Sequence, residues 1–93
     1  MNQELSAFIA QAQQWLAQQD APEPGSPRWY AIGNFRSFVS AVTADPSANS
    51  IATAVHSLRH FISDQYEWNA RYCRDISAQC EQAASIGKRL ARG

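Results

Sequence analysis

Hydrophobic residues recur through the second half of the chain at alternating steps of four and three positions. They are Ile51, Val55, Leu58, Ile62, Tyr72, Ile76, Ala83, Ile86 and Leu90. Amide side chains occupy the seam positions that interrupt this series, namely Gln65, Asn69 and Gln79. Neither glycine nor proline occurs between residues 47 and 86. This spacing is typical of a heptad seam and predicts one very long helix over about residues 46–91.

Two shorter helices are predicted before it, over about residues 3–19 and 27–43. The first has an apolar stripe at helical spacing, formed by Leu5, Phe8, Ile9, Ala12, Trp15 and Leu16. The second has a stripe formed by Trp29, Ile32, Phe35, Phe38, Val39 and Val42. Ser26 followed by Pro27 is a helix-start signal, and Asp45 followed by Pro46 repeats it.

These elements predict an all-α fold with a single helical domain over residues 1–93. We expect a three-helix bundle, in which a short helical hairpin packs on one long C-terminal helix. A helix of about 45 residues is about 68 Å long, roughly twice the diameter of a compact chain of this size. Ile76, Ile86 and Leu90 are therefore expected to lack partners within the chain. Gly33 is expected to let another helix approach closely, and Gly87 to be a fraying point.

Composition and charge argue against some classes of partner. The chain is 45% apolar and 17% charged, and its eight basic and eight acidic side chains cancel. A neutral chain has no global field that attracts nucleic acid, so nucleic-acid binding is not expected. No run approaches the ~18 apolar residues of a membrane span, and the first residues lack the features of a signal peptide. A cytoplasmic location without membrane contact is expected.

Cys73 and Cys80 are the only cysteines. On one continuous helix their Cα atoms would be about 10 Å apart, which is too far for a disulfide within that helix. They are expected to be reduced or to bridge two chains. No histidine shares their helical face, and a thiol without a base is a weak catalytic nucleophile. With no catalytic signature elsewhere, the chain is predicted to be non-enzymatic and to need no cofactor.

His56 and His60 are an i, i+4 pair, the spacing that lets two imidazoles bind one metal ion. Asp64 continues the same row and would supply a third ligand, with zinc as the favoured metal. All three residues point away from the predicted seam, so a solvated polar face explains them better. The metal site is therefore a minor alternative.

Aromatic and arginine side chains cluster in the middle of the predicted long helix. The residues of this cluster are Tyr66, Trp68, Arg71, Tyr72, Arg74 and Ile76. Trp, Tyr and Arg are enriched at the energetic centres of protein interfaces, so the cluster is predicted to bind another protein. The competing interpretation is that Trp68 and Tyr72 end the intrachain core, capped by Trp15 or Trp29. A small anionic ligand near Arg71 and Arg74 is a further alternative.

Self-association is the other expected partnership. Asn69 at a mid-seam position resembles the buried amide that sets register in dimeric coiled coils, and Ala83, Ile86 and Leu90 would continue the seam. A homodimer or higher homo-oligomer is therefore expected. The function predicted by elimination is steric occlusion of a partner protein, as in inhibitors, immunity proteins, antitoxins or phage anti-defence factors. The alternatives are a ligand-binding or metal-binding helical protein and a structural oligomer subunit.

Overall fold

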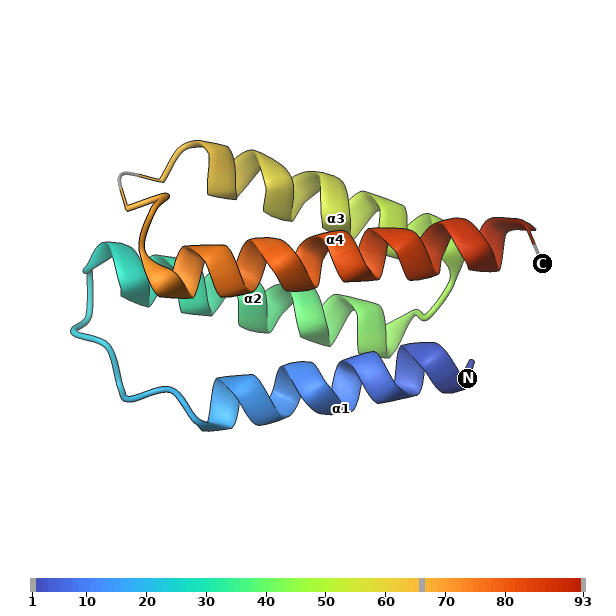
Figure 1. The fold of residues 1–93 in the computed structure, drawn as a ribbon, viewed down its shortest axis with the longest axis horizontal. Coiled ribbons are helices and arrows are strands. Elements are labelled where there is room, and N and C mark those ends of the chain that lie inside the picture. Colours follow the sequence, from blue (N-terminus) through green and yellow to red (C-terminus); the bar gives the residue numbers. More distant parts are fainter. Residues whose placement is uncertain (1, 66, 93) are drawn as a thin grey trace.

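The computed structural model describes residues 2–65 and 67–92. These residues form a bundle of four helices, each of which runs antiparallel to the one before it in the chain (Figure 1). The helices are α1 (Gln3–Ala17), α2 (Pro27–Ala44), α3 (Ala48–Ser63) and α4 (Arg71–Arg92). The prediction of an all-α bundle is confirmed. The bundle measures 40 × 24 × 19 Å, far short of the length of an unbroken 45-residue helix.

The predicted helix over residues 46–91 is wrong, because the chain breaks into two helices near the middle of the seam. Asp64 and Gln65 donate their backbone N–H groups to the carbonyls three residues back, which tightens and ends α3. The chain resumes helical structure at Arg71. Folding back lets the two halves of the seam pack on each other, and α3 with α4 is the most extensive helix contact in the bundle. The apolar seam residues are thus covered within the chain itself.

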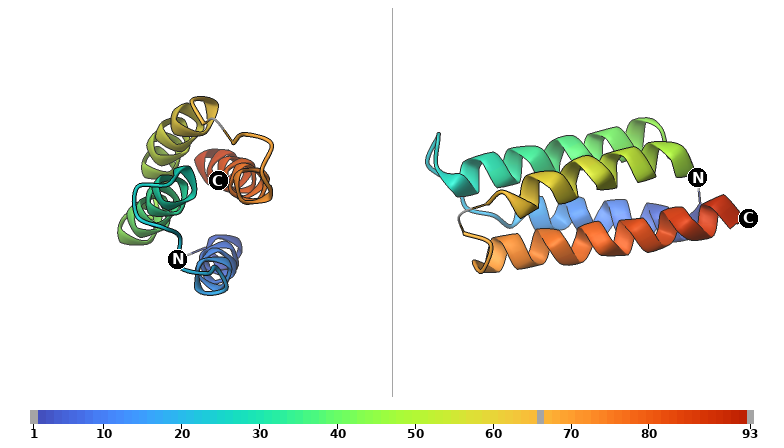
Figure 2. Two further views of the ribbon diagram at one scale, coloured as in Figure 1. Left: turned by 90° about the vertical axis from the view of Figure 1, so that its left-hand side faces the viewer. Right: turned by 90° about the horizontal axis from the view of Figure 1, so that it is seen from above.

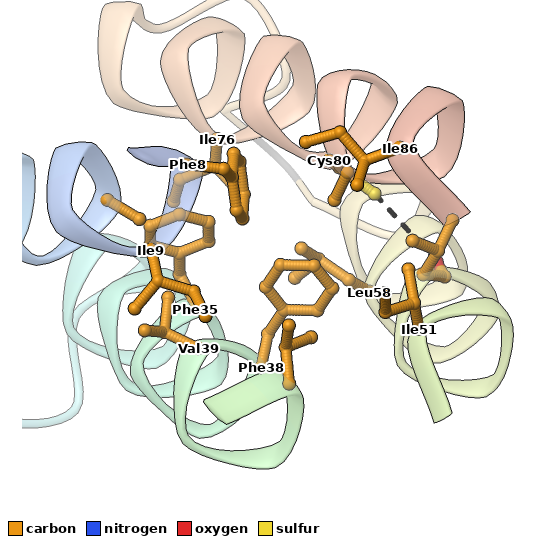
Figure 3. Close-up of a cluster of buried hydrophobic side chains, with 14 of the residues drawn as sticks. Phe8, Ile9, Phe35, Phe38, Val39, Ile51, Leu58, Ile76, Cys80 and Ile86 are labelled. Carbon is orange, nitrogen blue, oxygen red and sulfur yellow. Dashed lines mark hydrogen bonds between the residues drawn. The ribbon is translucent and has the colours of Figure 1, made fainter. Parts of the chain in front are cut away.

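Most of the seam residues that were expected to lack partners lie in the core. Ile76 and Ile86 are each 1% exposed, and Ala83 is fully buried. Figure 3 shows Ile76, Cys80 and Ile86 of α4 facing the cluster that Ile51 and Leu58 of α3 belong to. The expectation that Ile76 and Ile86 are uncovered is therefore wrong. Leu90 is half-buried and packs on the same core.

The first two helices begin and end close to the predicted positions. Asn2 caps α1 by accepting from the backbone N–H groups of Glu4 and Leu5, and Ser26 caps α2 by accepting from that of Trp29. Aromatic side chains join the two helices, with Trp15 edge-on to Phe35 at 5.5 Å between ring centroids.

The remaining stripe residues of α1 and α2 follow the prediction with one exception. Trp29 was expected in the buried stripe of α2 but is 42% exposed. It lies in the first turn of α2, beyond the last turn of α1, and stacks edge-on against Tyr30 instead.

The four helices are arranged around a central pair. Both α1 and α3 contact α2 and α4, and the end-on view in Figure 2 places α1 and α3 on opposite sides of that pair. The connection 18–26 and the described residues of the connection 64–70 lie at one end of the long axis, which we call the loop end (Figure 1). The connection 45–47 and the two chain ends lie at the other, which we call the turn end. Helices α2 and α4 both begin at the loop end.

Two helical glycines have opposite surroundings. A Cβ atom on Gly87 would lie 2.9 Å from Cγ2 of Ile51, so this glycine lets α4 approach α3 closely. A Cβ atom on Gly33 would meet nothing within 4 Å. The expectations for the two glycines are thus reversed, because Gly87 is a close-packing position and Gly33 faces open space.

Candidate functional site

The break in the seam divides the predicted partner-binding cluster between two faces of the loop end. Trp68 lies in the 64–70 connection and shares one hollow with Arg74. Arg71 and Tyr72 line a different pocket, on the side of α1. Ile76 belongs to the core, and Tyr66 lies outside the described residues. The long helix that was expected to carry the whole cluster is absent, since Trp68 lies between α3 and α4.

The hollow beside Trp68 has a volume of about 490 Å³ and lies between the end of α3 and the start of α4. It is lined by Ile62, Ser63, Trp68, Cys73, Arg74, Ser77 and Ala78. Trp68 is 69% exposed, more than either of the other large exposed hydrophobic side chains of the described residues. An apolar floor, an exposed tryptophan and one arginine are the components of an interface centre. We call this hollow and its lining the Trp68 surface.

The pocket on the other side has a volume of about 470 Å³ and is built from three helices. Its lining is Trp15, Gln18, Gln19, Arg28, Arg71, Tyr72 and Asp75. The indole Nε1 of Trp15 donates to Oδ2 of Asp75 over 3.1 Å, which ties the end of α1 to the first turns of α4. We call this the Arg28–Arg71 pocket.

The sequence did not predict that Arg28 and Arg71 line the same pocket. The two residues are far apart in the chain, and only the parallel start of α2 and α4 brings them to one pocket. One signal was available, since the start of α2 at Ser26–Pro27 places Arg28 in a first helical turn.

Tyr72 is a structural side chain at the edge of this pocket. It is half-buried, packs on the core and donates its hydroxyl to Oε1 of Glu67 over 2.9 Å. Burial, and then the hydrogen bond to Glu67, raise the pKa of the phenol above its ordinary value. Tyr72 therefore stays neutral, and it joins the 64–70 connection to α4.

The two thiols are free and buried. Burial raises the pKa of Cys73, and it raises the pKa of Cys80 to about 11. The Sγ of Cys80 lies 3.8 Å from the carbonyl oxygen of Val55 and donates to it (Figure 3). A protonated, covered thiol is a poor nucleophile, so the arrangement gives neither cysteine the thiolate that catalysis requires.

The metal site suggested by the histidine spacing is not assembled. His56, His60 and Asp64 are all exposed. Asp64 lies beyond the last residue of α3, so the row that relied on a continuing helix ends at His60. Within residues 2–65 and 67–92, no three His, Cys, Asp or Glu side chains are grouped so that they could hold a metal ion.

A second exposed aromatic group was not predicted. Trp29 and Tyr30 are 42% and 52% exposed, and their rings meet edge-on with centroids 4.9 Å apart. They line a hollow of about 520 Å³ together with Pro22 and Gly33. The proline-rich connector forms one wall of this hollow, which places a third binding-type surface at the loop end.

Comparisons with known proteins assign no family to this arrangement. None of the described helices is long and apolar enough to span a membrane. No protein-family model, no curated protein and no solved structure matches the chain.

Proposed function

We propose that the protein is a small non-enzymatic binding module that occludes the functional surface of a partner protein through its Trp68 surface. The observation that supports this most directly is the 69% exposure of Trp68 beside an apolar hollow. Leaving a large apolar side chain in water forfeits about 1.5–3 kcal/mol that burial would return. A contact that covers Trp68 recovers this free energy.

The chemistry of the hollow indicates what the partner presents. Ile62 and Ala78 offer apolar contact area, and the exposed Arg74 offers a fork of donors to a carboxylate. The expected partner segment therefore inserts an apolar side chain and carries an acidic residue next to it. Inhibitors, immunity proteins, antitoxins and phage anti-defence factors act in this steric way, and we place the protein in that functional group by its size and class.

A matched pair of tryptophan variants tests this proposal. Trp68→Ala removes the centre of the proposed surface, and Trp29→Ala removes an exposed tryptophan from a different face of the loop end. In affinity capture from cells that make the protein, we expect the wild type and Trp29→Ala to retain the same partner protein. Trp68→Ala should capture at least about tenfold less of that partner. The retained partner should lose its own activity on adding the wild type and keep it on adding Trp68→Ala.

Two results would overturn the steric proposal. A partner that Trp68→Ala retains as well as the wild type does would show that binding uses another surface. A large, defined homo-oligomer in light scattering, unaffected by Trp68→Ala, would favour a structural assembly subunit instead. Circular dichroism and urea unfolding of both variants verify that each is folded before binding is compared.

A further inference from the structure

The Arg28–Arg71 pocket contains two arginines that form no ion pair with another described residue. Among the described residues the ion pairs are Arg59 with Glu81 and Arg89 with Glu4, and neither Arg28 nor Arg71 takes part in one. A single carboxylate, that of Asp75, lines the pocket, and one of its oxygens accepts from the Trp15 indole. The lining therefore carries one more positive than negative side chain.

The protein orients one of these arginines from the neighbouring helix end. Gln19 donates through Nε2 to the carbonyl oxygen of Trp15 over 2.9 Å, which holds its own side-chain oxygen in place. That oxygen accepts from Nη2 of Arg28 over 3.4 Å. Arg28 is thus kept at the pocket by a neutral amide, which leaves its charge uncompensated.

Two helix starts add to the positive potential. Arg28 is the second residue of α2 and Arg71 is the first residue of α4, and both helices begin at the loop end (Figure 1). The first turn of a helix carries partial positive charge from backbone N–H groups that lack helical partners. These helix starts support the site, but the arginines in a shared cavity are what define it.

We propose that the Arg28–Arg71 pocket binds the phosphate group of a small ligand, gripped between the two guanidinium groups. Guanidinium forks match the geometry of phosphate oxygens, and two of them can reach more than one oxygen pair. The volume of about 470 Å³ falls within the range of small-molecule sites and exceeds what a phosphate ion fills. The remaining space, between Trp15 and Tyr72, accommodates the rest of the ligand.

Inorganic phosphate is the probe, and the indole N–H of Trp15 is the reporter. This N–H bonds to Asp75 in the pocket, so its NMR signal should move on titration with phosphate, whereas those of Trp29 and Trp68 should not. Arg28→Gln and Arg71→Gln should each weaken phosphate binding at least about tenfold. Arg74→Gln is the matched control, because it removes the same charge from the same turn of α4 but lines the Trp68 surface.

The outcomes separate a built site from general charge attraction. Unchanged binding in Arg74→Gln, with loss in the other two variants, supports the pocket. Equal weakening in all three variants, or an equal shift of the Trp15 signal with sodium chloride at matched ionic strength, overturns it. Neither Arg28 nor Arg71 lines the Trp68 surface. Absence of phosphate binding would therefore leave the steric proposal standing, and loss of the steric proposal would leave the phosphate site standing.

Discussion

The two ends of the bundle are built differently. At the turn end, Gly87 lets α4 lie directly against Ile51, and Arg89 of α4 pairs with Glu4 of α1. At the loop end, Trp68, Trp29 and Tyr30 are exposed, and Arg28 and Arg71 have no acidic partner among the described residues. The same core runs between them, so the difference is in how each end is closed. The turn end is closed by direct helix contact and an ion pair, whereas the loop end presents exposed aromatic and arginine side chains.

The largest expected difference concerns apolar residues that lie close together in the chain. Ile76 is 1% exposed in the core, so Ile76→Ala should lower the free energy of unfolding by about 2–5 kcal/mol through lost burial and a cavity. Trp68→Ala should change it by less than about 0.5 kcal/mol, because little of that side chain is buried. Urea unfolding of the two variants measures both values. A loss for Trp68→Ala as large as that for Ile76→Ala would show that the tryptophan belongs to the core.

That contrast also marks the limit of the sequence pattern. The seam residues were recognised correctly as the buried face, since apolar spacing reports which side of a helix is covered. The pattern is the same whether the cover is another chain or the same chain folded back, so it could not distinguish α3 and α4 from one long helix. No glycine or proline marks the break, which falls at polar residues including Asp64 and Asn69.

The candidate sites were less predictable than the helices. Trp68 was selected from its residue type, and its exposure follows from the break. Arg28 and Trp15 could not be joined to Arg71 by spacing along one helix, because their proximity is a property of the tertiary arrangement. Residue type thus identified candidates, while only the packing of α1, α2 and α4 grouped them.

A second and smaller difference is expected between the two helical glycines. Gly87→Ala gains about 1 kcal/mol of helix propensity but forces a methyl group against fully buried Ile51, at a cost of about 1–3 kcal/mol. It should therefore destabilise the protein. Gly33→Ala meets no neighbour and should stabilise it by about 0.5–1 kcal/mol. Thermal unfolding of both variants gives the sign of each effect, and two changes of the same sign would contradict the contrast in packing.

The smallest expected effect comes from a surface ion pair. Arg59 donates through Nε to Oε2 of Glu81 over 2.8 Å, and this hydrogen bond lowers the pKa of the carboxyl below its ordinary value of 4.5. A lowered pKa in the folded state contributes stability above pH 4.5, which is lost as the pH falls through the folded pKa. Glu81→Gln should therefore cost about 0.2–1 kcal/mol at neutral pH, and that cost should disappear in acid.

Arg71→Gln is the control for this measurement at the loop end. Since Arg71 pairs with no described carboxylate, its removal should leave the free energy of unfolding unchanged within about 0.5 kcal/mol at either pH. Urea unfolding at pH 7 and in acid measures both variants. A pH-dependent loss in Arg71→Gln would reveal an acidic partner for Arg71 and would weaken the contrast between the ends.

The attachment of α1 sets the order in which the bundle comes apart. Its contacts with α2 and α4 are less extensive than those that join α2, α3 and α4 in sequence. The hydrogen bond from Trp15 to Asp75 and the pairing of Glu4 with Arg89 close chain separations of 60 and 85 residues. Contacts of such long range form late in folding, whereas the contacts of α2 with α3 and of α3 with α4 join neighbouring segments of the chain and form early. Backbone amides of α1 should therefore exchange with solvent first, through an opening that leaves the other three helices assembled.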